Sequence, residues 1–361
     1  MQVFLARSLR PLGITLTLIN LSRHADASLV AQLEAEDVRI VSFPFPRLFS
    51  PVIFLRLIFF LRAEKFDLIH AYLTYSNIIA SIAGRISGIP VIASLRSSGY
   101  RQHKNALRER FENFCLQHLA DRVLANGNSV GEFARSRSGK TPVDVIVNAV
   151  NMVPPLSEEE RNILRGELVG NARRPLILSV GRLTKPKGFF DLLDAFKLIH
   201  SIHSNAALVI AGSGLLLNDL TSRVNELGLD QDVFLLGLRN DIPRLLAAAD
   251  IYVNSSHREG TPVSVLEAMS AGLAVVATSV GENPFLLDQS TGRLVPPGRP
   301  DELADAVIKL LESPQTRIEL GQSARAQAQK KYGQAGWRRN VLELYAKFIP
   351  EAKEILARLE V

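Results

Sequence analysis

The 361-residue chain is predicted to fold as an α/β protein with two similar halves, each built around a parallel sheet. Short runs rich in β-branched residues alternate with stretches long enough for helices, and this alternation favours parallel sheets. The alternation stops near residue 150 and then starts again. A chain of this length also exceeds what one hydrophobic core usually fills, so two domains are expected.

The predicted strands are short in both halves. In the first half they are residues 14–19, 38–43, 67–71, 90–94, 122–126 and 144–148. In the second half they are residues 175–180, 207–211, 233–237, 250–254 and 274–278. A doubly wound domain normally opens with a strand and a ligand-facing turn. Here residues 3–9 resemble the end of a helix before a turn at Gly13, so the first strand of the N-terminal domain is expected to be missing.

Two prolines mark the predicted border between the halves. Pro154 and Pro155 end any regular element, and the acidic segment 157–160 is expected to open a short helix. We therefore assign residues 1–152 to an N-terminal domain and residues 153–335 to a C-terminal domain. Residues 336–361 are predicted to form a C-terminal helix with enough apolar bulk to cross back to the N-terminal domain.

The positive charge belongs to the first half. Up to Val150 the chain holds 18 Lys and Arg against 11 Asp and Glu, and after it 24 against 25. A basic face suits an anionic membrane surface or a polyanionic substrate. Nucleic acid is not expected as a partner, because no recognised binding motif accompanies the charge. The most apolar run, residues 51–61, is far shorter than the roughly 20 residues of a spanning helix. The single cysteine, Cys115, excludes an internal disulfide.

One segment, residues 257–272, is predicted to be a loop that enters a helix. Thr261 can cap the helix, Pro262 can occupy its first position, and Gly272 supplies its end. The start of such a helix presents free N–H groups and the positive end of a dipole, which suit an anion. The segment therefore predicts a site for a phosphate-bearing ligand.

Two carboxylates flank this predicted anion site. Glu259 lies in the loop just before the helix, and Glu267 lies on its second turn. A ligand that carries both phosphate and several hydroxyl groups fits this arrangement. The alternative that these residues alone leave open is an ordinary surface loop with a solvated glutamate and a capped helix.

A basic turn is expected at the same edge of the same sheet. Residues 181–188, Gly-Arg-Leu-Thr-Lys-Pro-Lys-Gly, follow a predicted strand and precede a predicted helix. Arg182 and Lys187 are well placed there to receive a diphosphate, although a solvated basic turn is the alternative. Weaker signals follow the next two strands. They are the turn that starts at Gly212, and Arg239, which could lie beside a base-binding slot.

Together these motifs are similar to those of the family 4, group 1 retaining glycosyltransferases of the GT-B fold. The similarity rests on the Gly-Arg-Leu…Lys-Gly turn, on Glu259-Gly260, on Leu266-Glu267-Ala268-Met269, and on Gly292 to Val295 followed by Pro297-Gly298. It covers essentially the whole C-terminal domain. It implies two Rossmann-like domains whose parallel sheets face a central cleft, with a nucleotide-sugar donor on the C-terminal domain and the acceptor on the N-terminal side.

The resemblance also implies roles for individual residues. Arg182 and Lys187 would stabilise the departing nucleoside diphosphate, and Glu259 would contact the sugar. Glu267 would hold the ribose hydroxyls. The full donor-binding set expected from the resemblance is Gly181, Gly212, Arg239, Gly260, Thr261, Pro262 and Glu267.

The N-terminal domain matches the family less well. Residues 67–72 resemble an Asp-x-x-His-x-His segment with Tyr72 in place of the second histidine, and Arg96 stands where many relatives carry an acceptor-side histidine. His70 and Arg96 are therefore the acceptor-side candidates, with a packing role as an equal alternative for His70. No cluster of His, Asp and Glu has metal spacing, so no metal is predicted.

The implied activity is transfer of a hexosyl group, with retention of configuration, to a glycan or lipid-linked acceptor in the synthesis of cell-surface polysaccharide, including lipopolysaccharide, or of glycolipid. A UDP-sugar is preferred over a GDP-sugar as donor, and no other cofactor is expected. The expected location is the cytoplasm, with peripheral attachment to the inner face of the plasma membrane as a hypothesis. Three alternatives are a catalytically weak partner subunit, a GT-B sugar-nucleotide epimerase and a nonenzymatic carbohydrate-binding protein.

Overall fold

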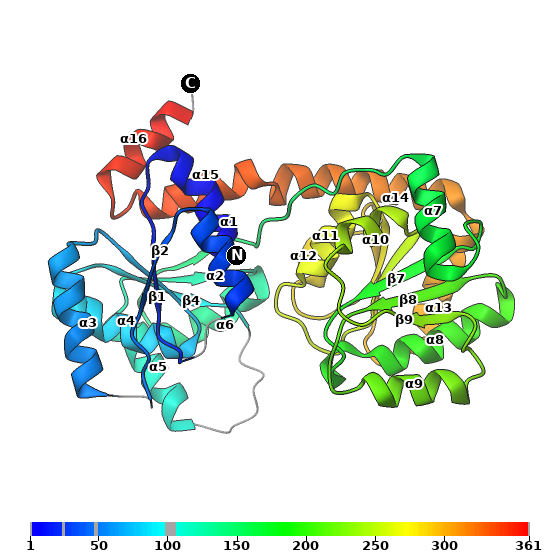
Figure 1. Cartoon of the computed structure of the whole chain (residues 1–361), viewed down its shortest axis with the longest axis horizontal. Helices are drawn as coiled ribbons and strands as arrows, with labels where there is room; N and C mark the ends of the chain where they lie inside the picture. Colours follow the sequence, from blue (N-terminus) through cyan, green and yellow to red (C-terminus); the bar gives the residue numbers. More distant parts are fainter. Residues whose placement is uncertain (1, 24–25, 47–49, 98–105, 360–361) are drawn as a thin grey trace. The chain divides into compact units, whose positions relative to one another are not determined.

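The computed structural model of the chain describes residues 2–23, 26–46, 50–97 and 106–359. The chain divides into two compact units (Figure 1). Unit 1 comprises Met1–Asn148 and Gln334–Val361, and unit 2 comprises Ala149–Gly333. Both units contain parallel sheets, so the α/β prediction is confirmed.

Unit 2 is built on one six-stranded parallel sheet. Its strand order is β12-β11-β10-β7-β8-β9. All the strands predicted for the second half are present, whereas β12 was not predicted as a strand because its four residues begin with glycine and carry an arginine. The strands are β7 (Leu176–Val180), β8 (Ala207–Ala211), β9 (Val233–Leu235), β10 (Ile251–Asn254), β11 (Ala274–Thr278) and β12 (Gly292–Val295).

Helices cover both faces of this sheet. Figure 1 shows α8, α9 and α13 along one face and α7, α10 and α11 along the other. The acidic segment before α7 forms a capping box, because the Ser157 side chain accepts from the Glu160 N–H while the Glu160 side chain accepts from the Ser157 N–H. The helices are α7 (Glu158–Val169), α8 (Phe189–Ile202), α9 (Leu217–Glu226), α10 (Ile242–Ala248), α11 (Val263–Ala271), α12 (Asn283–Leu286), α13 (Pro300–Glu312) and α14 (Pro314–Gln327).

The strand order reverses between β7 and β10, which lie side by side in the middle of the sheet. The chain leaves β7 toward β8 on one side and leaves β10 toward β11 on the other. By topology, the loops that follow these two strands lie at the carboxyl edge where ligands of open α/β sheets bind, and we call this position the β7/β10 crevice. This position holds the basic turn 181–188 and the loop that carries Glu259.

A buried carboxylate ties this part of the sheet to α7. Asp250 accepts hydrogen bonds from Arg165 at 2.9 Å, from Arg161 at 2.8 Å and from the backbone N–H of Leu176 at 2.7 Å. Burial by itself raises the pKa of Asp250, but the hydrogen bond and charge of Arg165, with help from Leu176 and Arg161, outweigh burial and hold this pKa below its usual range. The ionised carboxylate therefore links α7, β7 and β10.

Unit 1 contains two parallel sheets in its described residues. One pairs β1 with β2, and the other has the order β3-β4-β5-β6. All the predicted strands of the first half are present. Their boundaries differ from the prediction by up to three residues, because a strand extends only as far as it pairs with its neighbour. The four residues of β1, for example, pair with the four residues of β2. The strands are β1 (Thr17–Asn20), β2 (Arg39–Ser42), β3 (Ile69–Tyr72), β4 (Val91–Leu95), β5 (Arg122–Ala125) and β6 (Val143–Val145).

The described part of unit 1 begins with a helix, as the pattern of residues 3–9 predicts. After α1 the chain passes through a short 3-10 turn to Gly13, whose φ of +84° is left-handed. The last residues form two helices, α15 and α16, because Pro350 starts a new helix. The helices are α1 (Gln2–Leu9), α2 (Ala27–Ala35), α3 (Pro51–Glu64), α4 (Thr74–Ser87), α5 (Ala106–His118), α6 (Asn128–Arg137), α15 (Gln334–Tyr345) and α16 (Pro350–Leu359).

Helix α15 belongs to unit 1 and packs there through aromatic side chains. The rings of Phe4 and Trp337 meet edge to face with centroids 5.0 Å apart. Tyr345 contacts His70 of β3. Within the described ranges, no helix has the length and apolar character required to cross a bilayer.

Replacing Arg165 should destabilise unit 2, because it leaves Asp250 buried with one charged partner fewer. We expect Arg165→Leu to lower the free energy of unfolding by about 3 kcal/mol at neutral pH. Arg161→Leu is the control, since the Arg161 side chain is 36% exposed and its loss should cost about 1 kcal/mol or less. The measurement is urea-dependent hydrogen exchange in peptides that contain β7 and β10.

The Arg165–Asp250 pair also predicts that the free energy of unfolding depends on pH. A carboxylate with a depressed native-state pKa stabilises the fold above its unfolded-state pKa of about 3.9, and this contribution disappears as the pH falls through the native value. The stability difference between the unsubstituted chain and Arg165→Leu should therefore narrow below about pH 4. A difference that stays constant down to acidic pH would contradict this assignment to Asp250.

Candidate functional site

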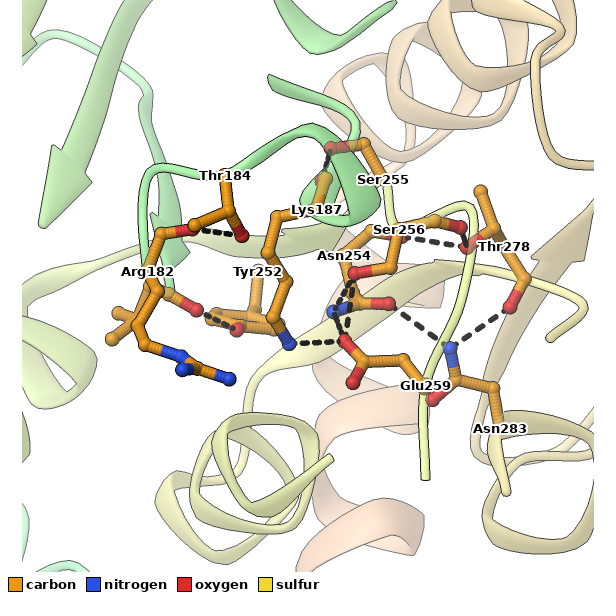
Figure 2. Close-up of polar contacts among 11 residues, drawn as sticks. Arg182, Thr184, Lys187, Tyr252, Asn254, Ser255, Ser256, Glu259, Thr278 and Asn283 are labelled. Carbon is orange, nitrogen blue, oxygen red and sulfur yellow. Dashed lines mark hydrogen bonds and ion pairs between the residues drawn. The ribbon is translucent and has the colours of Figure 1, made fainter. Parts of the chain in front are cut away.

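The centre of the candidate site is an ion pair between the two loops at the β7/β10 crevice (Figure 2). Lys187 Nζ donates to Glu259 Oε1 at 2.6 Å, and the two side chains are 20% and 7% exposed. The same oxygen accepts from Ser256 Oγ at 2.7 Å and from Asn254 Nδ2 at 3.2 Å. A carboxylate removed from water needs such partners, and here three of them fix its position.

A layer of polar residues beneath this pair holds the loop after β10. Asn283 Nδ2 donates to Asn254 Oδ1 at 3.0 Å and to the Thr278 carbonyl at 2.9 Å. Thr278 Oγ1 donates to the Ser256 carbonyl at 2.6 Å. Sequence reasoning missed Asn254, Ser256 and Asn283 as site residues. The signal in the sequence was the run Asn-Ser-Ser at residues 254–256, directly after a buried strand, because buried polar side chains need hydrogen-bond partners.

The loops after β7 and β10 approach each other closely. Gly188 has a φ of +63°, and a Cβ added there would lie 2.0 Å from the Ser255 carbonyl oxygen. Ser255 Oγ donates to the Lys187 carbonyl at 3.1 Å, and the N–H of His257 donates to the Pro186 carbonyl at 2.9 Å. Only glycine fits at residue 188, and this close approach brings the Lys187 side chain to Glu259.

Arg182 lies on the same turn but is not engaged. Its side chain is exposed, and it makes no side-chain hydrogen bond or ion pair with any residue that the structure describes. Figure 2 shows its guanidinium extending from the turn in the same direction as the Lys187 side chain. A second positive charge is therefore available beside the Lys187–Glu259 pair.

Two glycines from the predicted donor set pack against each other beside this turn. The N–H of Gly181 donates to the Ala211 carbonyl at 3.0 Å, and the N–H of Gly212 donates to the Gly237 carbonyl at 2.8 Å. A Cβ on Gly212 would lie 1.8 Å from the Gly181 carbonyl oxygen. The chain after β8 can therefore approach the basic turn only without a side chain at residue 212.

Arg239 is partnered within its own loop. Its Nε and Nη2 donate to the two carboxylate oxygens of Asp241 at 2.8 and 2.7 Å. The Arg239 side chain is 36% exposed. Its guanidinium fork is thus occupied in this structure, and its contact with a nucleotide base stays a prediction.

The helix after Glu259 begins one residue later than predicted. Pro262, not Thr261, is the N-cap of α11, with φ −74° and ψ 98°, and Val263 is the first helical residue. The prediction was wrong because proline's fixed φ is compatible with both an extended and a helical residue, and here ψ takes the extended value. The Pro262 carbonyl then accepts from the N–H of Val265 at 3.1 Å.

The other features of this segment lie where they were expected. Gly272 ends α11 in the left-handed conformation, with φ 79°. The carbonyl of Gly260 accepts from the N–H of Glu282 at 3.0 Å, which fixes the loop before the helix. Glu267 lies on the second turn of α11, and burial raises its pKa.

In unit 1, His70 and Arg96 belong to one partly buried polar cluster. The two ring nitrogens of His70 lie 2.7 Å from Tyr345 Oη and 2.7 Å from Ser94 Oγ. Arg96 lies 5.5 Å from the centre of the Tyr72 ring and donates to Asn148 Oδ1 at 3.0 Å. Burial and, to a lesser extent, the charge of Arg96 lower the pKa of His70 to about 3. His70 is therefore a neutral histidine that joins β3 to α15.

The described residues contain no group of three or more His, Cys, Asp or Glu side chains arranged to hold a metal ion. The functional groups assembled at the β7/β10 crevice are instead two cations, a fixed carboxylate and the start of a helix. The cations and the start of the helix can bind an anion, above all phosphate.

Solved structures define the class of the protein. HepE of Anabaena, determined in complex with UDP, superimposes with a TM-score of 0.86 at 22% identity, over 96% of each chain. Sucrose-phosphate synthase of Thermosynechococcus elongatus superimposes with a TM-score of 0.77 at 20% identity, over 95% of this chain and 91% of that one. The architecture is that of the GT-B glycosyltransferases.

Sequence comparisons define the family. Residues 160–327 match the family described as glycosyl transferases group 1, and residues 3–153 match glycosyltransferase family 4. The chain belongs to the family 4, group 1 glycosyltransferases and is an enzyme.

Two curated relatives are similar over most of their length. One is the UDP-Gal:alpha-D-GlcNAc-diphosphoundecaprenol alpha-1,3-galactosyltransferase of Escherichia coli, with 27% identity over 70% of this chain and 68% of the relative. The other is the alpha-D-kanosaminyltransferase of Streptomyces kanamyceticus, with 28% identity over 75% of each chain. The two relatives differ in the sugar that they transfer, so family membership does not specify the substrate.

Proposed function

We propose that this enzyme transfers a hexosyl group from a UDP-sugar to a glycan or lipid-linked acceptor, with retention of configuration, in the synthesis of a cell-surface polysaccharide or glycolipid. The observation that carries the proposal is the Lys187–Glu259 pair beside the unengaged Arg182 at the β7/β10 crevice. HepE binds UDP and UDP-glucose, and the Escherichia coli relative is named for a UDP-galactose donor and a diphosphoundecaprenol acceptor. Both support a UDP-sugar and a lipid-linked acceptor.

The leaving group explains why two cations lie in this turn. When the bond between the sugar and the diphosphate breaks, negative charge grows on the phosphate oxygens while the anomeric carbon becomes oxocarbenium-like. Lys187 and Arg182 then donate to that charge, and the N–H groups at the start of α11 add a positive dipole end. Since Glu259 and its neighbours already hold Lys187 in place, little reorganisation is required when the charge develops.

In this proposal the carboxylates of Glu267 and Glu259 accept hydrogen bonds from hydroxyl groups of the donor. Glu267 lies further along α11, where its carboxylate oxygens accept from the ribose hydroxyls. Glu259, which is fixed by Lys187, Ser256 and Asn254 at the mouth of the crevice, contacts the transferred sugar. The proposal leaves open whether an enzyme carboxylate attacks the sugar or the acceptor enters on the face that the diphosphate leaves.

Lys187→Ala should lower kcat by about a hundredfold while changing the donor KM much less, because Lys187 acts mainly on charge that develops in the transition state. Lys185→Ala is the matched control: it removes a cation from the same turn, and Lys185 is exposed. Release of UDP in the presence of acceptor is the measurement. Equal kcat values for the unsubstituted chain and Lys187→Ala would overturn the assignment. The anomeric configuration of the product, read by NMR, tests retention separately.

The donor can be identified by thermal stabilisation. A ligand present at 100 times its Kd stabilises the folded protein by about 2.7 kcal/mol. We expect UDP-sugars to raise the melting temperature more than GDP-, ADP- or dTDP-sugars at equal concentration, and we expect Arg182→Ala to reduce that shift. If a GDP-sugar gives the largest shift, the choice of base is wrong while the glycosyltransferase assignment is unaffected.

A membrane-surface acceptor is favoured by helix α3. Val52, Leu55 and Phe59 are 68%, 56% and 69% exposed, and their spacing places them on one side of the helix. Exposed Arg56 lies among them. On the opposite face of α3, Leu57 and Leu61 are buried, so that face packs in the core. Phe49, which precedes α3 closely in the sequence, lies outside the described residues.

An apolar face that carries arginine suits the surface of an anionic bilayer, so we expect the chain to sediment with vesicles containing phosphatidylglycerol at low salt. The double variant Leu55→Ser/Phe59→Ser should lose most of this binding. Leu215→Ser in unit 2 is the control, because Leu215 is also an exposed leucine, at 95%. Failure of the unsubstituted chain to sediment with the vesicles would refute membrane attachment.

A further inference from the structure

Arg96 carries a positive charge that has no negative partner among the described residues. It directly follows β4, at the carboxyl edge of the sheet β3-β4-β5-β6, and its side chain is partly buried. Within the ranges that the structure describes, Nη2 of Arg96 donates to Asn148 Oδ1 at 3.0 Å, and the guanidinium lies 5.5 Å from the centre of the Tyr72 ring. Both partners are uncharged, so neither neutralises the guanidinium.

The sequence around this edge offers no carboxylate to Arg96. Residues 98–105, which lie outside the described structure, contain no Asp or Glu in the sequence. The same holds for the segments that follow the four strands, which are residues 73–76, 96–97, 126–129 and 146–148. Arg137, the more deeply buried arginine of unit 1, is by contrast paired with Glu112 at 3.0 Å. Since charged groups withdrawn from water are normally paired, Arg96 departs from the rule.

The aromatic neighbours of Arg96 are held neutral. Burial is the main cause for both His70, whose pKa it lowers to about 3, and Tyr72, whose pKa it raises to about 12. Burial also lowers the pKa of Arg96, and Tyr72 opposes this shift. A guanidinium nevertheless stays protonated in a protein. In the described part of this cluster, a permanent positive charge is therefore surrounded by neutral hydrogen-bonding groups.

The donors of Arg96 are oriented but mostly unused. A guanidinium has five N–H donors, and the hydrogen bond to Asn148 uses one of those on Nη2. Asn148 and the face of the Tyr72 ring hold the group in place, and the ring adds a cation–π attraction. The remaining donors form the planar fork that matches two oxygens of an anion. The arrangement therefore suits an anionic ligand that arrives from outside the chain.

We propose that Arg96 binds a phosphate group of the acceptor, so that the acceptor of this enzyme is phosphorylated or phosphate-linked rather than a neutral glycan. The inference rests on the proposed function, in which unit 2 binds the donor and the acceptor is the remaining substrate. A phosphate supplies both the oxygens that the fork requires and the charge that the cluster lacks. A lipid-linked acceptor carries such a group where phosphate joins the lipid to the sugar, whereas a neutral glycan would leave the charge of Arg96 unpaired.

The test measures binding of two acceptor analogues by calorimetry, with the full chain saturated with UDP so that the donor site is occupied. One analogue is glucosyl decyl diphosphate, in which the diphosphate joins the sugar to the alkyl chain, and the other is the neutral decyl glucoside. We expect the unsubstituted chain to bind the diphosphate at least about tenfold more tightly than the glucoside. Arg96→Gln should remove this preference.

Two control variants separate the charge of Arg96 from a structural role. Arg85→Gln removes an exposed arginine of α4 from the same unit and should keep the preference. Asn148→Ala removes the hydrogen-bond partner of Arg96 but leaves its charge, so most of the preference should remain. If Arg96→Gln does not fold, Arg96→Lys replaces it. It should lose part of the preference, because lysine keeps the charge but lacks the fork.

Several results would overturn the proposal. They are equal affinity of the unsubstituted chain for the two analogues, an unchanged preference in Arg96→Gln, and equal losses in Arg96→Gln and Asn148→Ala. Decyl glucuronide that binds as tightly as the diphosphate would assign a carboxylate instead. Soluble dihexanoyl phosphatidylglycerol that binds as tightly would assign a lipid headgroup.

The proposed function fails separately from this inference. Lys187→Ala lacks a cation of the donor site in unit 2, and in this variant the preference for the diphosphate can be measured without UDP. Absence of UDP release from UDP-sugars by the unsubstituted chain would refute the proposed function. Loss of the diphosphate preference, with UDP release intact, would refute only the role of Arg96.

Discussion

The chemistry that we propose for the C-terminal unit depends on the hydrogen bond between Lys187 and Glu259, which joins two loops 72 residues apart in the sequence. The bond exists because β7 and β10 are neighbours at the point where the strand order reverses, so the loops after both strands open into one crevice. It also solves an electrostatic problem. A nearly buried carboxylate is costly unless it is paired and hydrogen-bonded, and Lys187, Ser256 and Asn254 supply those partners.

The arrangement of this pair suits a ligand that brings its own negative charge. The residues beneath Glu259 leave the carboxylate little freedom, whereas Arg182 on the opposite loop is exposed and unengaged within the described structure. A diphosphate can therefore bind Arg182 without breaking an existing interaction and can share Lys187 with Glu259. In the proposed function, a fixed carboxylate that orients the donor lies beside an exposed cation that binds the leaving group.

The two units use buried polar groups differently. In unit 2, Asp250 is held ionised by Arg165 and Arg161, and this charge ties α7 to the middle of the sheet. In unit 1, His70 is held neutral between Tyr345 and Ser94, which joins the C-terminal helix α15 to β3. Unit 1 differs from unit 2 also in its sheets, because its described strands form two sheets whereas those of unit 2 form one.

The sequence by itself determined the α/β class, the positions of nearly all strands and the motifs from which the donor site is proposed, because these depend on local patterns. The β-branched runs, the Gly-Arg-Leu…Lys-Gly turn and the helix stop at Gly272 are readable within a few residues. Only the tertiary structure decided which groups meet. Strand order and backbone angles determine which groups pair and where the helix begins. The results are the hydrogen bonds of Lys187 to Glu259 and of Asn283 to Asn254, the pairing of Arg239 with Asp241, and the N-cap at Pro262. The partners of His70 also come from elements far apart in the chain, and no local pattern encodes such a meeting.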